Sequence, residues 1–142
     1  EIMLDTNMDY ESIAKAGSLL GSGAVIVMDE DTNMVEVIHR IARFYYSESC
    51  GQCTPCREGT GWMYKIIDKI LKGKGTLEDL KTLESIPNMI SGSTICALGD
   101  AAAMPVESFI KNYKKEFLKY IKNKEKVLGK NNNNKEFLLQ QK

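Results

Sequence analysis

The sequence predicts a mainly α-helical protein, with a four-helix bundle over residues 31–128, a short α+β segment over residues 1–30 and a flexible tail over residues 129–142. Two observations lead to this prediction. Apolar residues recur every three or four positions through most of 31–128, which is the period of a helix that buries one face. Only one short run, residues 24–28, has the β-branched composition of a strand. Helices must therefore supply the core.

Composition limits the classes of function. The chain has 142 residues, which suit one ordinary domain, and its 43% hydrophobic content is enough for a core. Nineteen basic and nineteen acidic residues cancel, so net charge offers no argument for nucleic acid. No apolar run approaches the roughly 20 residues of a membrane span. We expect no nucleic-acid partner, no signal peptide, and membrane association only through other proteins.

Residues 1–30 are expected to be the remnant of another fold. Residues 13–16 suggest a short helix, and Ala24 to Met28 suggest a buried strand. A single strand needs neighbours to pair its backbone groups, and the chain offers no second one. Gly21-Ser22-Gly23 precedes the strand and no lysine follows, which argues against a phosphate-binding loop. We therefore expect this segment to depend on a partner for its order.

Two helices are expected on either side of a cysteine-rich loop. Asp31 or Thr32 is a plausible N-cap of the first helix, which leads the chain into that loop. A second helix should start within residues 57–61 and end at Leu71. Trp62 lies on its apolar stripe, where a lone tryptophan is usually part of the core.

Two further helices are expected after Gly75. Thr76 and Asp79 have the spacing of a capping box, which starts the third helix, and Pro87 should end or kink it. Asp100 should cap or begin the fourth helix, which continues to Leu128. Four asparagines within residues 129–134 break the apolar pattern, so a flexible tail is expected there.

All four cysteines lie in two loops. Cys50, Cys53 and Cys56 form a C-x2-C-x2-C run between the first two helices, and Cys96 lies in the loop before the fourth. Three thiols spaced two residues apart can meet three corners of a cubane iron-sulfur cluster, and a fourth from elsewhere completes the set. The spacing therefore predicts one four-iron, four-sulfur cluster, with these cysteines as metal ligands.

Other uses of these residues stay open. Structural zinc sites usually pair two short knuckles with two ligands each, so a zinc-binding adaptor module is the main alternative, followed by disulfides or by inert or redox-sensing thiols. His39 could bind metal but is more simply a partly exposed helix residue. Arg57 could moderate the charge of the cluster, or form a surface ion pair with Glu58 or Glu48.

The residues around the cysteines resemble a known family. Residues 49–62 read SCGQCTPCREGTGW and residues 94–106 read TICALGDAAAMPV. Both are similar to the carboxy-terminal part of the NADH-binding flavoprotein subunit of respiratory complex I. Residues 8–30 resemble the end of the small ubiquitin-like, soluble-ligand-binding-like domain that precedes the cluster domain in that family. Related subunits of NAD-linked hydrogenases and formate dehydrogenases share the cysteine triplet and are an alternative.

The resemblance implies an electron-transfer module of NADH:quinone oxidoreductase. In the family, hydride passes from NADH to FMN in a large domain, and single electrons then move through this cluster toward quinone. No glycine-rich FMN or NADH motif of the family occurs in these residues, so FMN and NAD are expected only in the missing large domain. We expect no catalytic residue here and no NADH oxidation by this chain alone.

The resemblance also implies partners and a location. The expected partners are the missing FMN/NADH domain and other subunits of the peripheral arm, including the small 2Fe-2S subunit and the large multi-cluster subunit. The expected location is peripheral, on the cytoplasmic side of a bacterial inner membrane or on the matrix side of the mitochondrial inner membrane.

Overall fold

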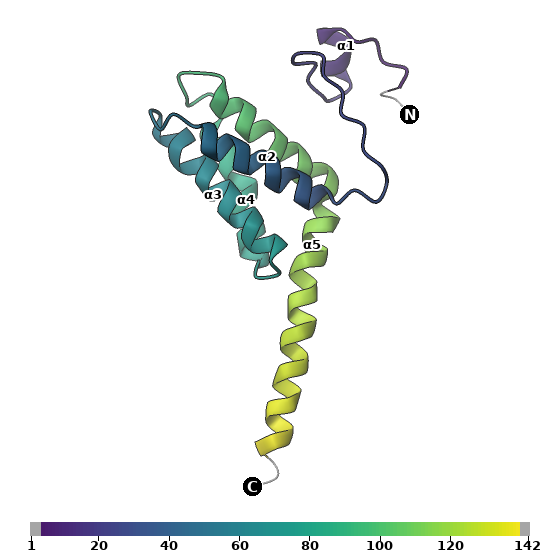
Figure 1. Ribbon diagram of the computed structural model, residues 1–142, viewed down its shortest axis with the longest axis vertical. Coiled ribbons are helices and arrows are strands. Elements are labelled where there is room, and N and C mark those ends of the chain that lie inside the picture. Colours follow the sequence, from purple (N-terminus) through teal and green to yellow (C-terminus); the bar gives the residue numbers. More distant parts are fainter. Residues whose placement is uncertain (1–3, 140–142) are drawn as a thin grey trace. The chain divides into compact units, whose positions relative to one another are not determined.

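A computed structural model describes residues 4–139 of the chain and the side chains of residues 4–121. It contains five α-helices and divides into two compact units, residues 1–32 and residues 33–142 (Figure 1). Residues 1–3 and 140–142, which belong to the expected remnant and tail, lie outside the described part.

The first unit contains one short helix, α1 (Tyr10–Lys15), as the sequence predicted. Asp9 caps it, because its carboxylate accepts a hydrogen bond from the Ser12 backbone N–H at 2.7 Å. None of the residues of α1 is buried. The short length and the lack of burial leave this helix with little tertiary stabilisation of its own.

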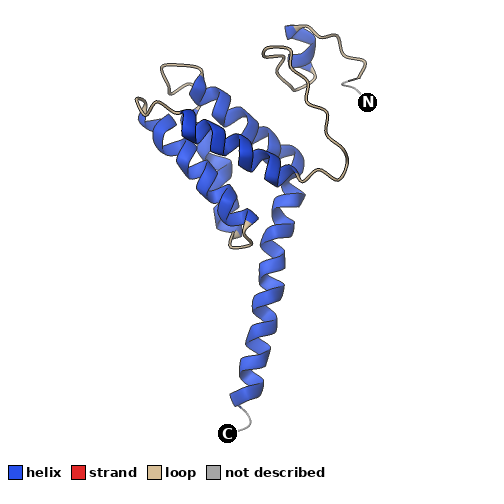
Figure 2. Cartoon of the chain, viewed as in Figure 1, coloured by secondary structure: helices blue, strands red, loops and turns tan. Residues whose placement is uncertain are grey.

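The strand expected over residues 24–28 is absent, and the described residues contain no strand at all (Figure 2). Val25, Ile26 and Val27 instead lie in an irregular segment with exposures of 72%, 79% and 90%. The physical reason is that a strand pairs its N–H and C=O groups with a neighbouring strand, and the described residues offer none.

The second unit is the predicted helical bundle. It comprises α2 (Met34–Glu48), α3 (Thr54–Leu71), α4 (Leu77–Ile90) and the first part of α5 (Leu98–Leu139) (Figure 1). Successive helices pack on one another, α2 also packs on α5, and α3 and α5 touch across the bundle. The mainly α-helical fold is thus confirmed, and no helix within the described residues is long and apolar enough to span a membrane.

Each of these helices contributes side chains to one continuous core. Full burial of one such side chain stabilises the fold by about 1.5–3 kcal/mol, before entropy is counted. The largest of the side chains with 0% exposure are Phe117, Ile38, Ile67, Ile70, Leu83 and Ile90.

The observed helix ends differ from the predicted ones by a few residues. Asn33, rather than Asp31 or Thr32, caps α2, because its side chain accepts hydrogen bonds from the backbone N–H groups of Val35 and Glu36. The second helix, α3, begins at Thr54 instead of within residues 57–61, since Pro55 suits a first helical turn. The predicted capping box of α4 is present.

Proline and asparagine interrupt the helices less than the sequence suggested. Pro87 lies inside α4, which continues to Ile90, since a missing N–H near a helix end removes only one hydrogen bond. Helix α5 runs through residues 129–134 without the expected break; its only non-helical backbone is at Tyr113, with φ −120° and ψ 23°. A helix closes its own backbone hydrogen bonds, so it can continue past the bundle. The flexibility of residues 129–139 stays a prediction.

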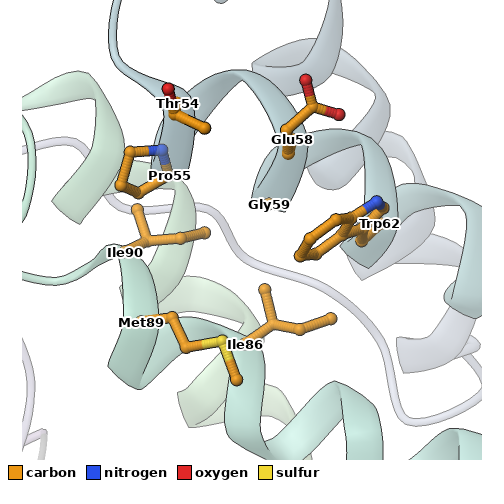
Figure 3. A pocket seen from close by; sticks show the side chains of 8 residues that line it. All are labelled: Thr54, Pro55, Glu58, Gly59, Trp62, Ile86, Met89 and Ile90. Carbon is orange, nitrogen blue, oxygen red and sulfur yellow. The ribbon is translucent and has the colours of Figure 1, made fainter.

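The expectation that Trp62 belongs to the core is wrong. Its side chain is 48% exposed, and on the facing helix Met89 is 57% exposed. Together with Ile86 and Ile90 they border an apolar pocket of about 210 Å³ between α3 and α4 (Figure 3). Helical periodicity places Trp62 on an apolar stripe, but it does not show that the stripe is wider than the surface that α4 covers.

Candidate metal centre

The four cysteines lie at one end of the bundle. The α2–α3 loop contains Cys50 and Cys53, the first turn of α3 contains Cys56, and the α4–α5 loop contains Cys96. The two loops lie at the same end of the bundle in Figure 1. The antiparallel order of the helices therefore gathers cysteines that are forty residues apart in sequence.

One hydrogen bond joins the two loops directly. The backbone N–H of Ile95 donates to the Sγ atom of Cys53, with 3.4 Å between nitrogen and sulfur. Ile95 immediately precedes Cys96, so this contact brings the fourth cysteine next to the triplet. The same N–H points to a sulfur atom that, as a metal-bound thiolate, would accept its hydrogen bond.

The four thiols differ in exposure. Cys56 is 7% exposed, Cys53 is half-buried, and Cys50 and Cys96 are exposed. All four are free thiols. The set therefore rests on the core on the Cys56 side and faces outward on the Cys50 and Cys96 side. An arrangement of this kind holds a bound group firmly while leaving one edge accessible to another protein.

The α2–α3 loop is shaped by a glycine and an arginine. Gly51 has φ +80°, a left-handed conformation that residues with a side chain rarely adopt. The Arg57 guanidinium donates from Nη1 to the Gly51 carbonyl oxygen at 2.9 Å and from Nε to Glu58 at 2.9 Å. Of the two uses considered for Arg57, the ion pair with Glu58 is thus observed. The same side chain also tethers the loop to α3.

The start of α3 provides a favourable field for negative charge. Cys53 is the N-cap, and its side chain makes no capping hydrogen bond, so the first N–H groups of α3 are not satisfied by it. The N-terminus of a helix carries a partial positive charge that stabilises nearby anions. The sulfur atoms of Cys53 and Cys56 lie at this terminus, so a negatively charged group bound there would meet a favourable field.

The α4–α5 loop is held by its own side chains. The Thr94 hydroxyl donates to the Cys96 carbonyl oxygen at 2.9 Å, and a side chain on Gly99 would overlap Thr94. The Asp100 carboxylate accepts from the Gly92 backbone N–H at 2.8 Å, across the loop. Asp100 was expected to cap or begin the fourth helix; α5 instead begins at Leu98, and Asp100 fastens the loop that carries Cys96.

Two hydroxyl groups contact Cys56, and neither contact was predicted from the sequence. The Ser49 hydroxyl lies 3.3 Å from the Sγ atom of Cys56. The Thr60 hydroxyl, on a residue with 0% exposure, donates to the Cys56 carbonyl oxygen at 2.8 Å. Thr60 could have been found from its position four residues after Cys56 on a helix. Ser49 could not, because its contact depends on the path of the loop between the two residues.

His39 lies in another part of the bundle. Its Nε2 atom is 3.2 Å from a carboxylate oxygen of Asp68, and its ring lies 5.1 Å from that of Tyr64. Its side chain is 19% exposed. These contacts agree with the simpler interpretation of His39 as a partly exposed helix residue.

The donor set has the chemistry of iron-sulfur ligands. Among the described residues, no group of three or more His, Cys, Asp or Glu side chains is close enough to hold one metal ion. A tetrahedral zinc site requires four ligands around one point. A cubane cluster instead takes each thiolate at a separate corner, so its ligands stand farther apart. Four cysteines on two loops at one end of the bundle are the donor set that such a cluster takes.

Comparison with known proteins supports the same assignment. Residues 36–120 match the family described as the NADH-ubiquinone oxidoreductase-F iron-sulfur binding region. In Rickettsia rickettsii, the F-type subunit of NADH-quinone oxidoreductase is 46% identical over 120 residues, which is 84% of this chain and 28% of that protein. In Rhizobium meliloti, an F-type subunit of NADH-quinone oxidoreductase is 46% identical over 119 residues, or 84% of this chain and 27% of that protein.

A solved structure has a similar fold. An NAD+-reducing NiFe-hydrogenase in the H2-reduced state matches 69% of this chain and 17% of its own chain, with a TM-score of 0.65 and 35% identity. The chain thus spans less than a third of the length of these relatives. The family match covers well over half of the chain and includes all four cysteines, most of α2, all of α3 and α4, and α5 up to residue 120. The chain therefore belongs to the family of the NADH-ubiquinone oxidoreductase-F iron-sulfur binding region.

Proposed function

We propose that this chain is the electron-transfer module of an NADH:quinone oxidoreductase of the complex I type, holding one four-iron, four-sulfur cluster. The observation that carries the proposal is the hydrogen bond from the Ile95 N–H to the Cys53 sulfur, which joins the two cysteine loops. It lies within the part of the chain that matches the iron-sulfur binding region of the family.

The ligands of the cluster are the thiolates of Cys50, Cys53, Cys56 and Cys96. When bound, the cluster supplies one-electron transfer at a potential set by its surroundings. The chain's own residues do the rest. The Cys56 side would anchor the group on the core, the helix start and the Ile95 N–H would stabilise its negative charge, and the exposed Cys50 and Cys96 would form its accessible edge.

The remainder of the relatives' length holds the parts this chain does not supply. FMN and NAD bind in the large domain, which receives hydride from NADH and passes single electrons to this module. The partners are that domain and peripheral-arm subunits, including the small 2Fe-2S subunit and the large multi-cluster subunit. The assembly is peripheral, on the cytoplasmic side of a bacterial inner membrane or the matrix side of the mitochondrial one.

The same module could serve an NAD-linked hydrogenase. The similarity to the NAD+-reducing NiFe-hydrogenase, at a TM-score of 0.65 and 35% identity, favours this as the second candidate. The F-type relatives of NADH-quinone oxidoreductase are 46% identical, which favours NADH:quinone oxidoreductase as the first. Both candidates assign the same electron-transfer role to the four cysteines.

Comparing dithionite with NADH as the electron donor distinguishes an electron-transfer module from a complete NADH-oxidising enzyme. The chain, reconstituted with iron and sulfide without oxygen, is expected to show broad visible absorption that dithionite bleaches and that NADH leaves unchanged. A chain with Cys53→Ser should lose this absorption, and Ser47→Ala, whose hydroxyl donates to the Phe44 carbonyl, should keep it. NADH-driven reduction of ferricyanide by the pure chain, without added flavoprotein, would contradict the proposal.

A further inference from the structure

We infer that Ser49 sets the reduction potential of the bound cluster through a hydrogen bond from its hydroxyl group to the sulfur of Cys56. The inference rests on the proposed function, since it requires a cluster on the four cysteines. It concerns a residue of this chain that is not a ligand and that the family match does not single out.

Ser49 and Cys56 each lie at the end of a helix. Ser49 is the C-cap of α2, and its backbone N–H donates to the Tyr45 carbonyl oxygen at 3.1 Å. Cys56 lies in the first turn of α3, and Thr60 holds its carbonyl oxygen at 2.8 Å. The 3.3 Å between the Ser49 Oγ atom and the Cys56 Sγ atom is thus a distance between the ends of two packed helices.

Ligation determines the direction of this hydrogen bond. A free thiol and a hydroxyl can each donate to the other, but a metal-bound thiolate has no proton to give. In the loaded protein the Ser49 hydroxyl must therefore be the donor and the Cys56 sulfur the acceptor. Serine does not titrate in the ordinary pH range, so the donor is present at any pH at which the protein folds.

The environment makes this hydrogen bond effective. Cys56 is 7% exposed, while Cys50 and Cys96 are exposed and can accept hydrogen bonds from water. Cys53 accepts from a backbone N–H, which no side-chain substitution removes. Ser49 is thus the one side-chain donor to a cysteine sulfur seen among the described side chains. It acts where water competes least and electrostatic interactions are strongest.

Charge gives the sign of the effect. Reduction adds one negative charge to the cluster and its thiolates, and a hydrogen bond to sulfur becomes stronger as the sulfur becomes more negative. The Ser49 hydroxyl therefore stabilises the reduced form more than the oxidised form and raises the potential. Removal of the hydroxyl should shift the potential to a more negative value.

The test is a dithionite titration with redox mediators, followed by electron paramagnetic resonance, on full chains reconstituted without oxygen. Iron and sulfide are first measured in the wild type; a chain that binds no cluster contradicts the proposed function rather than this inference. Ser49→Ala is expected to shift the midpoint potential negatively. Ser47→Ala is the control, because the Ser47 hydroxyl lies at the same end of α2 and donates to a backbone carbonyl oxygen. This variant should leave the midpoint potential unchanged.

A second pair of variants isolates the hydroxyl from the volume of the side chain. Threonine keeps the hydroxyl and valine replaces it by a methyl group of similar size, so Ser49→Thr should lie near the wild type and Ser49→Val near Ser49→Ala. Equal potentials for the threonine and valine variants, or a positive shift in Ser49→Ala, would overturn the inference. Loss of the cluster in both Ala and Val variants would also overturn it, because Ser49 would then hold the loop without setting the potential.

Discussion

At the scale of single residues, the hydrogen bonds of Asp79 illustrate how a helix start is stabilised at the end of the bundle away from the cysteines. Burial raises the pKa of Asp79, but hydrogen bonds from Lys69 and Thr76 outweigh it and hold the pKa below its usual value of 3.8. Lys69 donates to one carboxylate oxygen and Thr76 to the other, both at 2.8 Å. The carboxylate of Asp79 therefore stabilises the fold in its ionised form.

The sign of the pH dependence follows from this lowered pKa. The stabilisation is present above about pH 4 and is lost as the pH falls through the pKa of the folded protein. We predict that Lys69→Met raises the Asp79 pKa toward 3.8, as measured by carbon-13 NMR of the side-chain carboxyl. Lys65→Met, one turn earlier on α3, is the control. An unchanged Asp79 pKa in Lys69→Met would contradict the assignment.

Residues whose partners are local could be predicted from the sequence. The Thr76 and Asp79 capping box is encoded within four residues and was found from spacing alone. The cap of α2 was misplaced, because Asp31, Thr32 and Asn33 all have suitable side chains and propensity does not choose among neighbours. The contact between Ser49 and Cys56 escaped prediction because a loop path decides it.

At the scale of elements, the approach of α3 to α4 depends on a glycine. A Cβ atom on Gly59 would lie 2.6 Å from Cδ1 and 2.8 Å from Cγ1 of Ile90, which has 0% exposure. Alanine improves helix propensity by about 1 kcal/mol, but overpacking a core costs about 1–3 kcal/mol. The cost of the overlap should exceed the gain in helix propensity. This glycine therefore allows α4 to pack close beneath the cysteine motif.

We predict that Gly59→Ala lowers the free energy of unfolding by up to about 2 kcal/mol, as measured by denaturant unfolding. Ile90→Val removes the nearer of the two atoms, so Gly59→Ala should cost less in that background than in the wild type. The single Ile90→Val variant is the control. An equal cost in both backgrounds would mean that Ile90 is not the group that opposes a side chain at position 59.

The presence of each helix was easier to predict than how far its neighbours cover it. The four bundle helices follow from apolar periodicity, since each must bury one face. That same periodicity put Trp62 in the core, whereas it borders an exposed pocket, because a stripe shows which side is apolar and not how much of it a neighbour covers. The prediction of a strand over residues 24–28 was wrong for a different reason. The composition of these residues suits a sheet, but the described residues offer no second strand to pair with.

At the scale of the whole molecule, the two units differ in what holds them together. The second unit has a continuous core built by its helices, whereas α1 in the first unit has no buried residue. Large apolar side chains of the first unit stay exposed, including Leu4, Leu19, Ile26 and Val27. Exposed apolar surface on this scale suits a segment that is completed by further protein.

We therefore predict fast amide exchange through residues 1–30 and slow exchange in α2, α3 and α4 of the cluster-loaded chain, as measured by hydrogen-deuterium exchange with mass spectrometry. Residues without buried contacts or paired backbone groups open at little cost in free energy. Slow exchange throughout Val25 to Met28 in a monomer would contradict this prediction, because it would require a packing partner within the chain.

The central claim is that Cys50, Cys53, Cys56 and Cys96 together bind one cubane cluster. The three-plus-one spacing predicts these ligands from the sequence, and the hydrogen bond between Ile95 and Cys53 shows that the fold brings their loops together. The most direct test is the iron, acid-labile sulfide and zinc content of the chain purified and reconstituted without oxygen. We expect about four irons and four sulfides per chain and a brown protein. A colourless protein with one zinc ion per chain would contradict it.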